Sequence, residues 1–198
     1  MAKNLTDKIA EAGSPHRMLW ESQDPPIVST PVTPEFTNWR DEQLAWRSNA
    51  VLFDQSHHMA DLNIKGPDAL KLIRDTAINS VEKFPVDSAK QYVATNADGQ
   101  LIGDNILFRY EEDEFQAVGV PPTISWLEYH AKKGGYDVQL TRDNPSYCRV
   151  GGGDPIVYRF EVQGPGAMDV IGELLGHEPP EVKFFQGTRF TIAGKMVR

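Results

Sequence analysis

The sequence contains one cysteine, no long apolar run and no cluster of basic residues. Cys148 has no second cysteine to pair with and no neighbours at metal-ligand spacing, so we predict neither a disulfide nor a metal site. No stretch approaches the roughly 18 consecutive apolar residues of a membrane-spanning helix, and the N-terminus lacks the apolar core of a signal peptide. We therefore expect a cytoplasmic protein without contact to membranes.

The charge and the missing motifs exclude further classes. The 20 lysines and arginines are scattered along a chain of net charge −8, which argues against nucleic acid as a partner because phosphate binding needs clustered positive charge. The sequence also lacks the HExxH zinc motif, the GxSxG nucleophile elbow, a phosphate loop and the GxGxxG dinucleotide fingerprint. With 40% apolar residues, we expect a packed core and a small-molecule or protein partner, whereas the oligomeric state stays unknown.

One unit occurs twice, at residues 60–73 and 158–171, 98 residues apart. In each copy polar and apolar residues alternate, a Gly-Pro pair follows at Gly66 or Gly164, and helical spacing comes next. A Gly-Pro pair alone can interrupt any strand-to-helix turn, but two copies in matching context favour a duplication. The sequence therefore predicts an α+β fold built on duplicated strand–turn–helix units.

The domain organisation follows from proline and capping signals. Residues 1–37 form a proline-rich N-terminal arm with a short helical turn at 14–20, and residues 38–198 form the domain. Asn38 is the predicted N-cap of a helix to residue 49, on which Trp39 and Trp46 share a face that we expect in the core. Further helices are predicted at 67–77 and 123–133, and strands at 51–65, 90–97, 101–110, 114–120 and 137–141. Residues 190–198 predict two strand pieces around a turn, and since the sequence stops inside the second, we expect the N-terminal part of a longer protein.

The densest group of polar residues is 53–59, Phe-Asp-Gln-Ser-His-His-Met. Buried polar groups need hydrogen-bond partners, so this cluster indicates either an internal network or a ligand site. In a regular strand His57 and His58 point to opposite faces, and at most one of them lines a site. The alternative is one satisfied core imidazole and one surface imidazole.

Four segments together resemble a known family. Residues 53–59, 66–69 (Gly-Pro-Asp-Ala), 99–105 (Gly-Gln-Leu-Ile-Gly-Asp-Asn) and 162–165 (Val-Gln-Gly-Pro) follow the pattern of the folate-binding aminomethyltransferase superfamily, which includes the T-protein of glycine cleavage. Residues 37–43, 77–80 and 183–185 are similar to the tetrahydrofolate-dependent aromatic O-demethylases of the vanillate and syringate type. The resemblance implies intertwined α+β halves around a central folate channel. It also implies a longer protein, because members of that branch continue beyond the match.

The resemblance implies methyl transfer from a methoxylated aromatic to N5 of tetrahydrofolate. His58 would be catalytic, donating to the phenolic oxygen or moving a proton, and Gln55 would orient the ring substituents. These positions fall on opposite faces of a regular strand, so the resemblance requires a bulge between them. A catalytic tyrosine and most folate contacts would lie beyond Arg198, and we do not expect this chain alone to catalyse the reaction.

Two departures from the family pattern bear on the substrate. Gly103 stands where the glycine-cleavage enzymes carry the first residue of an Asp-Asp pair, and Val120 stands where the vanillate-type enzymes hold the substrate carboxylate with an arginine. Valine cannot pair with a carboxylate, so the substrate either lacks one or binds it elsewhere. Two alternatives stay open: a glycine cleavage-type aminomethyltransferase, which Gly103 disfavours, and a non-catalytic folate-binding protein of the iron–sulfur assembly type.

Overall fold

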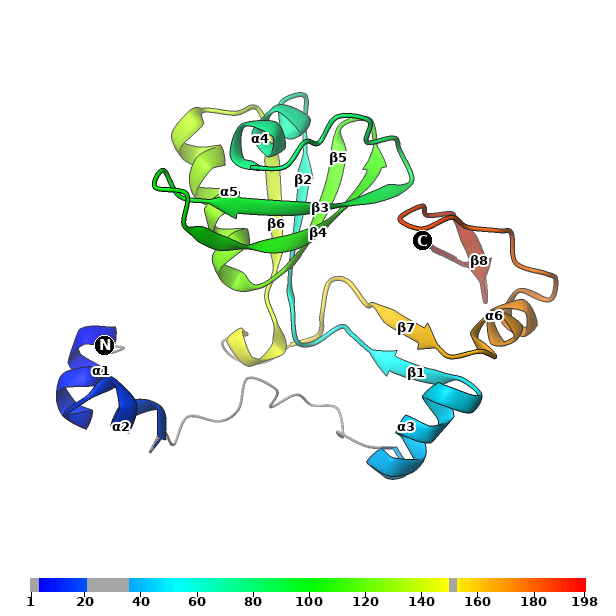
Figure 1. Cartoon of the computed structure of the whole chain (residues 1–198). Helices are drawn as coiled ribbons and strands as arrows, with labels where there is room; N and C mark the ends of the chain where they lie inside the picture. Colours follow the sequence, from blue (N-terminus) through cyan, green and yellow to red (C-terminus); the bar gives the residue numbers. More distant parts are fainter. Residues whose placement is uncertain (1–3, 21–35, 150–152) are drawn as a thin grey trace.

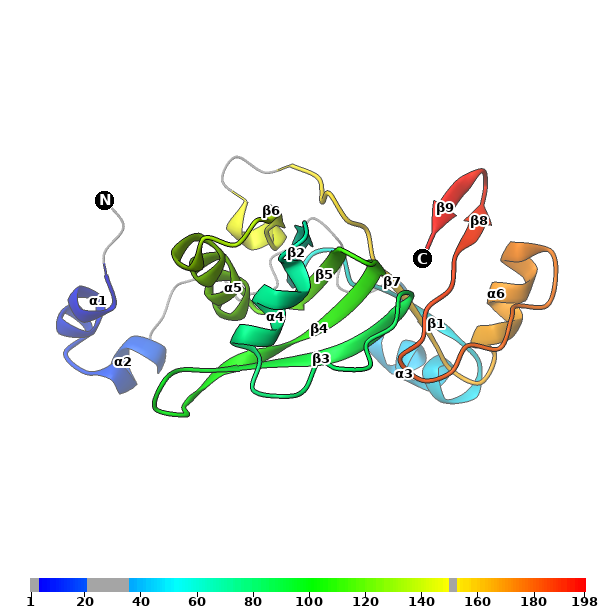
Figure 2. The same ribbon diagram turned by 90° about the horizontal axis from the view of Figure 1, so that it is seen from above.

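The main body of the protein is a five-stranded antiparallel sheet with two helices on one face (Figures 1 and 2). The computed structural model describes residues 4–20, 36–149 and 153–198. The strands lie in the order β3-β4-β5-β2-β6, with bounds β2 Ala60–Lys65, β3 Ser88–Thr95, β4 Leu101–Glu111, β5 Glu114–Gly119 and β6 Gln139–Asp143. Helices α4 (Ala69–Thr76) and α5 (Pro121–Gly134) cover the sheet. No described helix is long and apolar enough to cross a membrane.

The core lies between this sheet and its two helices. Alternate residues of β2 point towards the helices, and Leu62 and Ile64 are fully buried against side chains of α4 and α5 such as Leu72 and Leu127. Full burial of one such side chain stabilises the fold by about 1.5–3 kcal/mol. The other face of β2 carries Asp61, Asn63 and Lys65, so the period-two pattern separates an apolar face from a polar one.

The predicted duplication is confirmed. Strand β2 and helix α4 form the first copy, and strand β7 (Phe160–Gln163) with helix α6 (Ala167–Leu175) forms the second. Gly66 and Gly164 have positive φ angles of 145° and 127°, and a Cβ atom there would lie 2.4 Å from Asp137 O and 2.3 Å from Asn49 O respectively. In both copies the turn's third residue donates its N–H to that same carbonyl. Glycine is therefore required for the same reason in each copy.

The two halves of the molecule exchange strands. Strand β2 pairs with β6, whereas β7 pairs with β1 (Val51–Asp54), and all pairs are antiparallel. The chain passes from β1 into β2 through residues 55–59 and returns from β6 towards β7 through residues 144–159. Figure 1 shows β1 and β7 side by side away from the larger sheet. The chain thus crosses between the halves twice, as the expected intertwined α+β architecture requires.

The second half is less covered than the first. Phe160 of β7 occupies the repeat position of Leu62, yet its exposed fraction is 57% whereas Leu62 is fully buried. In the first half helices α4 and α5 cover the equivalent face of the sheet. Helix α3 (Trp39–Ser48) has its predicted N-cap, since the Asn38 side chain accepts from Asp41 N.

The predicted core position of the tryptophan pair is wrong. Trp39 and Trp46 are each 48% exposed. The Trp39 ring instead lies 4.2 Å from the Arg40 guanidinium carbon, and Trp46 meets the edge of Phe53 with 6.4 Å between ring centroids. Shared helical spacing places two rings on one face, but only another packed element can bury that face.

Other boundaries differ from the predictions in instructive ways. The single strand predicted over 51–65 is interrupted at 55–59, and β6 ends at residue 143 rather than 141. Helix α5 begins at Pro121, because proline is suited to a first helical turn. Helix α2 (Pro15–Trp20) agrees with the predicted turn, whereas α1 (Leu5–Ala12), capped by Asn4, was not predicted. The prolines of the arm between residues 25 and 34 lie outside the described residues.

The last strands agree with the sequence pattern. Strands β8 (Phe190–Ile192) and β9 (Lys195–Val197) pair around a turn at Ala193 and Gly194. The loop at 144–154 contains a short 3-10 helix, Ser146–Cys148, and part of its triple glycine lies outside the described residues. The segment before β8 returns to the first half, where Ala89 N donates to Phe185 O.

Candidate functional site

The predicted site residues lie where the chain crosses between the halves. Residues 55–59 leave strand geometry between β1 and β2 and contact Ser146 and Arg159 of the segment that leads from β6 to β7. Gln55 N donates to Arg159 O at 2.8 Å, and Ser146 N donates to His57 O at 2.9 Å. In place of the bulge that the resemblance requires between positions 55 and 58, the structure has a full interruption of the strand over residues 55–59.

His57 belongs to an internal network. Its side chain is almost fully buried, with Nδ1 2.7 Å from Ser146 Oγ and Nε2 3.5 Å from Asp54 Oδ2. Burial raises the pKa of Asp54, but hydrogen bonds from Ser56 and the nearby His57 outweigh it and hold that pKa below its usual value. Both ring nitrogens of His57 thus face protein partners, which is the arrangement of a satisfied core imidazole.

His58 has a different environment. It is partly buried, and its ring forms no hydrogen bond to another described residue. Burial lowers the pKa of His58, the positive charge of Arg159 lowers it further, and Asp61 acts in the opposite direction. The ring is consequently neutral near pH 7, with one nitrogen able to donate a hydrogen bond and the other able to accept one.

Gln55 is held across the strand exchange. Its Nε2 donates to Glu161 Oε2 at 3.0 Å, and its backbone carbonyl accepts from Arg159 Nη1 at 3.2 Å. Sequence reasoning missed Glu161, which alternation on β7 places on one face of that strand without indicating a partner. Gln55 and Glu161 together therefore present an amide and a carboxylate side by side.

Val120 lies at the same end of the sheet as His58. Ala60 pairs with Gly119 in the β2–β5 ladder, so Val120 is opposite the residues that directly precede β2. Val120 is 48% exposed and is the N-cap residue of α5. A Cβ atom added at Gly103 would lie 3.6 Å from Val120 Cγ2. The two departures from the family pattern are thus neighbours in space, although 17 residues separate them in the sequence.

An ion pair joins the two crossing segments. Arg159 Nη2 donates to both carboxylate oxygens of Asp61 at 2.6 Å each, and Gln116 Nε2 donates to the same carboxylate at 3.1 Å. Sequence reasoning did not select these residues. The signal was available, because Asp61 and Arg159 occupy the same position in the two repeats with opposite charge.

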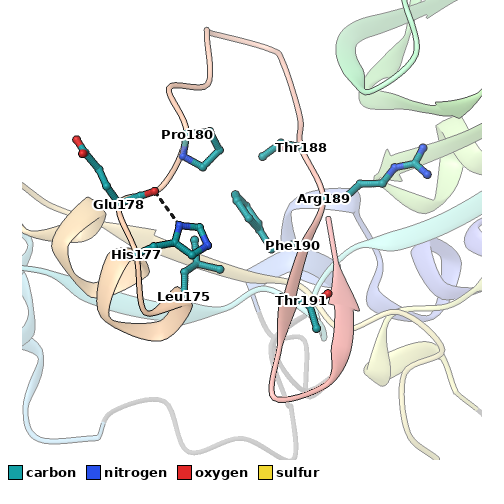
Figure 3. A pocket seen from close by; sticks show the side chains of 8 residues that line it. All are labelled: Leu175, His177, Glu178, Pro180, Thr188, Arg189, Phe190 and Thr191. Atoms are coloured by element: carbon teal, nitrogen blue, oxygen red, sulfur yellow. Dashed lines mark hydrogen bonds between the residues drawn. The ribbon is translucent and has the colours of Figure 1, made fainter.

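A pocket lies elsewhere, between the end of α6 and strand β8 (Figure 3). Its charged and ring groups already have partners: Arg189 Nη2 lies 3.2 Å from Asp87 Oδ1 and 2.9 Å from Glu111 Oε1, and His177 Nδ1 donates to Glu178 O at 2.9 Å. It shares no residue with the crossing. Among the described residues, no group of three or more histidine, cysteine or acidic side chains is arranged to hold a metal ion.

Comparisons with known proteins identify the family of the chain. Residues 20–198 match the GCVT N-terminal domain. The chain is 44% identical over 197 residues to a syringate O-demethylase from Sphingobium sp., which covers all of this chain and 42% of that protein. It is 28% identical over 162 residues to an aminomethyltransferase from Exiguobacterium sibiricum, covering 80% of this chain and 41% of that protein. The chain therefore spans about two fifths of the length of these curated relatives.

A solved structure agrees with the fold. The glycine cleavage system aminomethyltransferase T from Bartonella henselae matches with a TM-score of 0.57 and 22% identity, over 77% of this chain and 38% of that one. At that identity the match concerns the fold alone. The duplicated units, the strand exchange and the match over residues 20–198 agree with the resemblance seen in the motifs. The chain belongs to the GCVT N-terminal domain family.

Proposed function

We propose that the intact protein transfers a methyl group from a methoxylated aromatic substrate to tetrahydrofolate. The observation that carries this proposal is His58, a partly buried, neutral imidazole without a protein hydrogen-bond partner among the described residues, at the same end of the β2–β5 ladder as the exposed apolar Val120. Identity of 44% to a syringate O-demethylase over the whole chain supports the same reaction class.

His58 would meet the charge on the leaving group. The reaction breaks the methyl–oxygen bond, and the phenolate that leaves has a conjugate acid with a pKa of about 10. A poor leaving group of this kind needs a donor placed where its charge develops, and removal of one such donor typically slows catalysis by roughly 10²–10³-fold. The neutral His58 ring can donate one N–H to the ether oxygen, while Gln55 and Glu161 can hydrogen-bond ring substituents.

The two buried carboxylates among the described residues do not point to a folate contact. Bound tetrahydrofolate would supply the nucleophilic nitrogen N5. A pterin ring needs buried acceptors and donors that are free, whereas the buried carboxylates Asp61 and Asp143 already pair with arginines. The Nδ2 atom of Asn105 lacks a partner among the described residues, but this residue is buried beneath Gly119 and Thr123. We therefore assign no folate contact to this part of the protein.

The apolar wall at Val120 and Gly103 favours an uncharged substrate. Once a bound aromatic ring excluded water from the exposed Val120 side chain, a carboxylate facing it would gain no partner, which is costly. The Arg159 guanidinium already pairs with Asp61, so Arg159 is not free to bind a substrate carboxylate in place of the missing arginine. We propose methoxyphenols or methoxylated aldehydes as the substrate class.

The direct test is product formation. The intact protein, incubated with 2-methoxyphenol and tetrahydrofolate, should form 5-methyltetrahydrofolate and catechol in equal amounts, measured by chromatography. His58→Ala should lower the rate by roughly 10²–10³-fold. His130→Ala is the matched control, because burial also lowers the pKa of this partly buried imidazole on α5, yet it lies outside the crossing. Absence of 5-methyltetrahydrofolate with all methoxyarenes tested would refute the proposal.

A further inference from the structure

Asp61 and Arg159 occupy equivalent positions in the two repeats and form an ion pair with each other. Each residue is the second of its repeat, following Ala60 in one copy and Tyr158 in the other. The ion pair therefore joins the two copies directly, through equivalent positions. Here the counterparts carry opposite charges and meet at 2.6 Å.

The environment of the pair makes both partners necessary. Asp61 is 4% exposed, so its carboxylate has lost almost all contact with water. A buried carboxylate without a cation is strongly unfavourable, and removing one partner of such a pair destabilises a protein much more than removing a surface pair. The third hydrogen bond, from Gln116, fills another acceptor position of the carboxylate. Asp61 therefore holds the Nη2 end of the Arg159 guanidinium in place.

The rest of Arg159 contacts the bend that carries the candidate site. Its Nη1 donates to Gln55 O at 3.2 Å, and its backbone carbonyl accepts from Gln55 N at 2.8 Å. Its backbone N–H donates to Ser56 Oγ at 2.9 Å. These bonds hold the two residues that immediately precede His57 and His58. The guanidinium thus links the Asp61 carboxylate to the backbone of the site.

We propose that Arg159 is a positioning residue: anchored on Asp61, it fixes the backbone at residues 55 and 56 so that Gln55 and His58 face one substrate. This inference rests on the function proposed above. Arginine suits the role because its rigid planar fork donates to two acceptors at a fixed angle, whereas a lysine ammonium is a single flexible donor centre. Arg159→Lys therefore keeps the charge beside Asp61 but loses the simultaneous hold on Gln55 O.

The experiment compares Arg159→Lys with the matched control Arg142→Lys in the intact protein. Arg142 pairs with Glu128 at 2.6 Å, both partly buried, and its other side-chain bonds go to Ser125 and Asn144 rather than to residues 55 and 56. The readouts are urea unfolding, the imidazole resonances of histidine-labelled protein, and kcat/KM for 2-methoxyphenol. We expect Arg159→Lys to shift the His58 resonances and to lower kcat/KM by about 10- to 100-fold, because small misplacements of reacting groups cost rates of that order. Arg142→Lys should leave both unchanged.

Two results overturn the inference. If folded Arg159→Lys keeps the His58 resonances of the wild type, the Asp61–Arg159 pair only stabilises the fold. The same conclusion holds if the Arg142→Lys control shifts these resonances equally. If Arg159→Lys does not fold, the exchanged pair Asp61→Arg with Arg159→Asp keeps opposite charges at the two positions while removing the donor to Gln55 O. There, displaced His58 resonances support the inference and unchanged ones refute it. The resonances need no turnover, so a protein without methyl transfer would refute the proposed function and still test the positioning.

Discussion

Replacing His57 by alanine should destabilise the protein far more than replacing its neighbour His58. His57 is buried, and its ring contacts Ser146 Oγ at 2.7 Å and Asp54 Oδ2 at 3.5 Å. Loss of one such hydrogen bond costs about 1 kcal/mol, and the cavity left by a buried ring adds to it. We therefore expect His57→Ala to lower the free energy of unfolding by roughly 2–4 kcal/mol.

His58→Ala should have the opposite profile. The ring is only partly buried and forms no hydrogen bond to a described residue, so we expect a loss of about 1 kcal/mol or less. Its catalytic effect should be much larger, because it removes the donor that meets the phenolate charge. The ratio of the two effects, rather than either alone, separates a structural histidine from a catalytic one.

The assay combines urea unfolding with steady-state kinetics on the intact protein. Unchanged m-values would show that a shift in the unfolding midpoint reports stability. His57→Gln is the companion variant, since its amide can restore a hydrogen bond to Ser146 and should recover part of the lost stability. Equal losses of kcat/KM in folded His57→Ala and His58→Ala would refute the assignment of different roles.

Four further outcomes follow from the structure. Val120→Arg should change the ratio of kcat/KM for a methoxybenzoate to that for the matched methoxyphenol in favour of the acid, by about 1–3 kcal/mol in transition-state free energy. If the wild type already prefers the acid and the variant leaves that preference unchanged, the carboxylate binds elsewhere. Gly66→Ala should lower the free energy of unfolding by roughly 2–5 kcal/mol, because the new Cβ atom would clash with Asp137 O. In the control Gly99→Ala the new Cβ atom has no neighbour within 4 Å, so the loss should be about 1–2 kcal/mol. Equal shifts in melting temperature for the two variants would contradict the clash. The pKa of His58 is lowered from 6.5, so below about pH 6.5 the unfolded chain binds a proton that the folded protein does not, and the free energy of unfolding should fall as the pH falls. His58→Gln should lessen this fall, as measured by urea unfolding at several pH values. An identical pH profile in the variant would refute the lowered pKa. The 198-residue chain should bind a hydrophobic dye through the exposed face around Phe160, and a dye-free, monodisperse monomer would count against it.

Local signals in the sequence determined much of the fold. The two Gly-Pro turns predicted both strand–turn–helix units, since only glycine tolerates a carbonyl where its Cβ would be. Asn38 predicted the start of α3, because a side-chain cap depends on the next three residues alone. The polar cluster at 53–59 likewise marked the crossing, because polar residues in an apolar strand need partners wherever they lie.

Contacts between distant segments were decided only by the tertiary structure. The exposure of Trp39 and Trp46 depends on which elements cover α3, and helical spacing carries no information about a cover. Gly103 and Val120 become neighbours through the register of β4 and β5 and the start of α5. Asp61 and Arg159 read as ordinary charged strand residues in their own segments. They form an ion pair because the strand exchange brings the two repeats together, and the Arg159 charge offsets part of the cost of burying the Asp61 carboxylate.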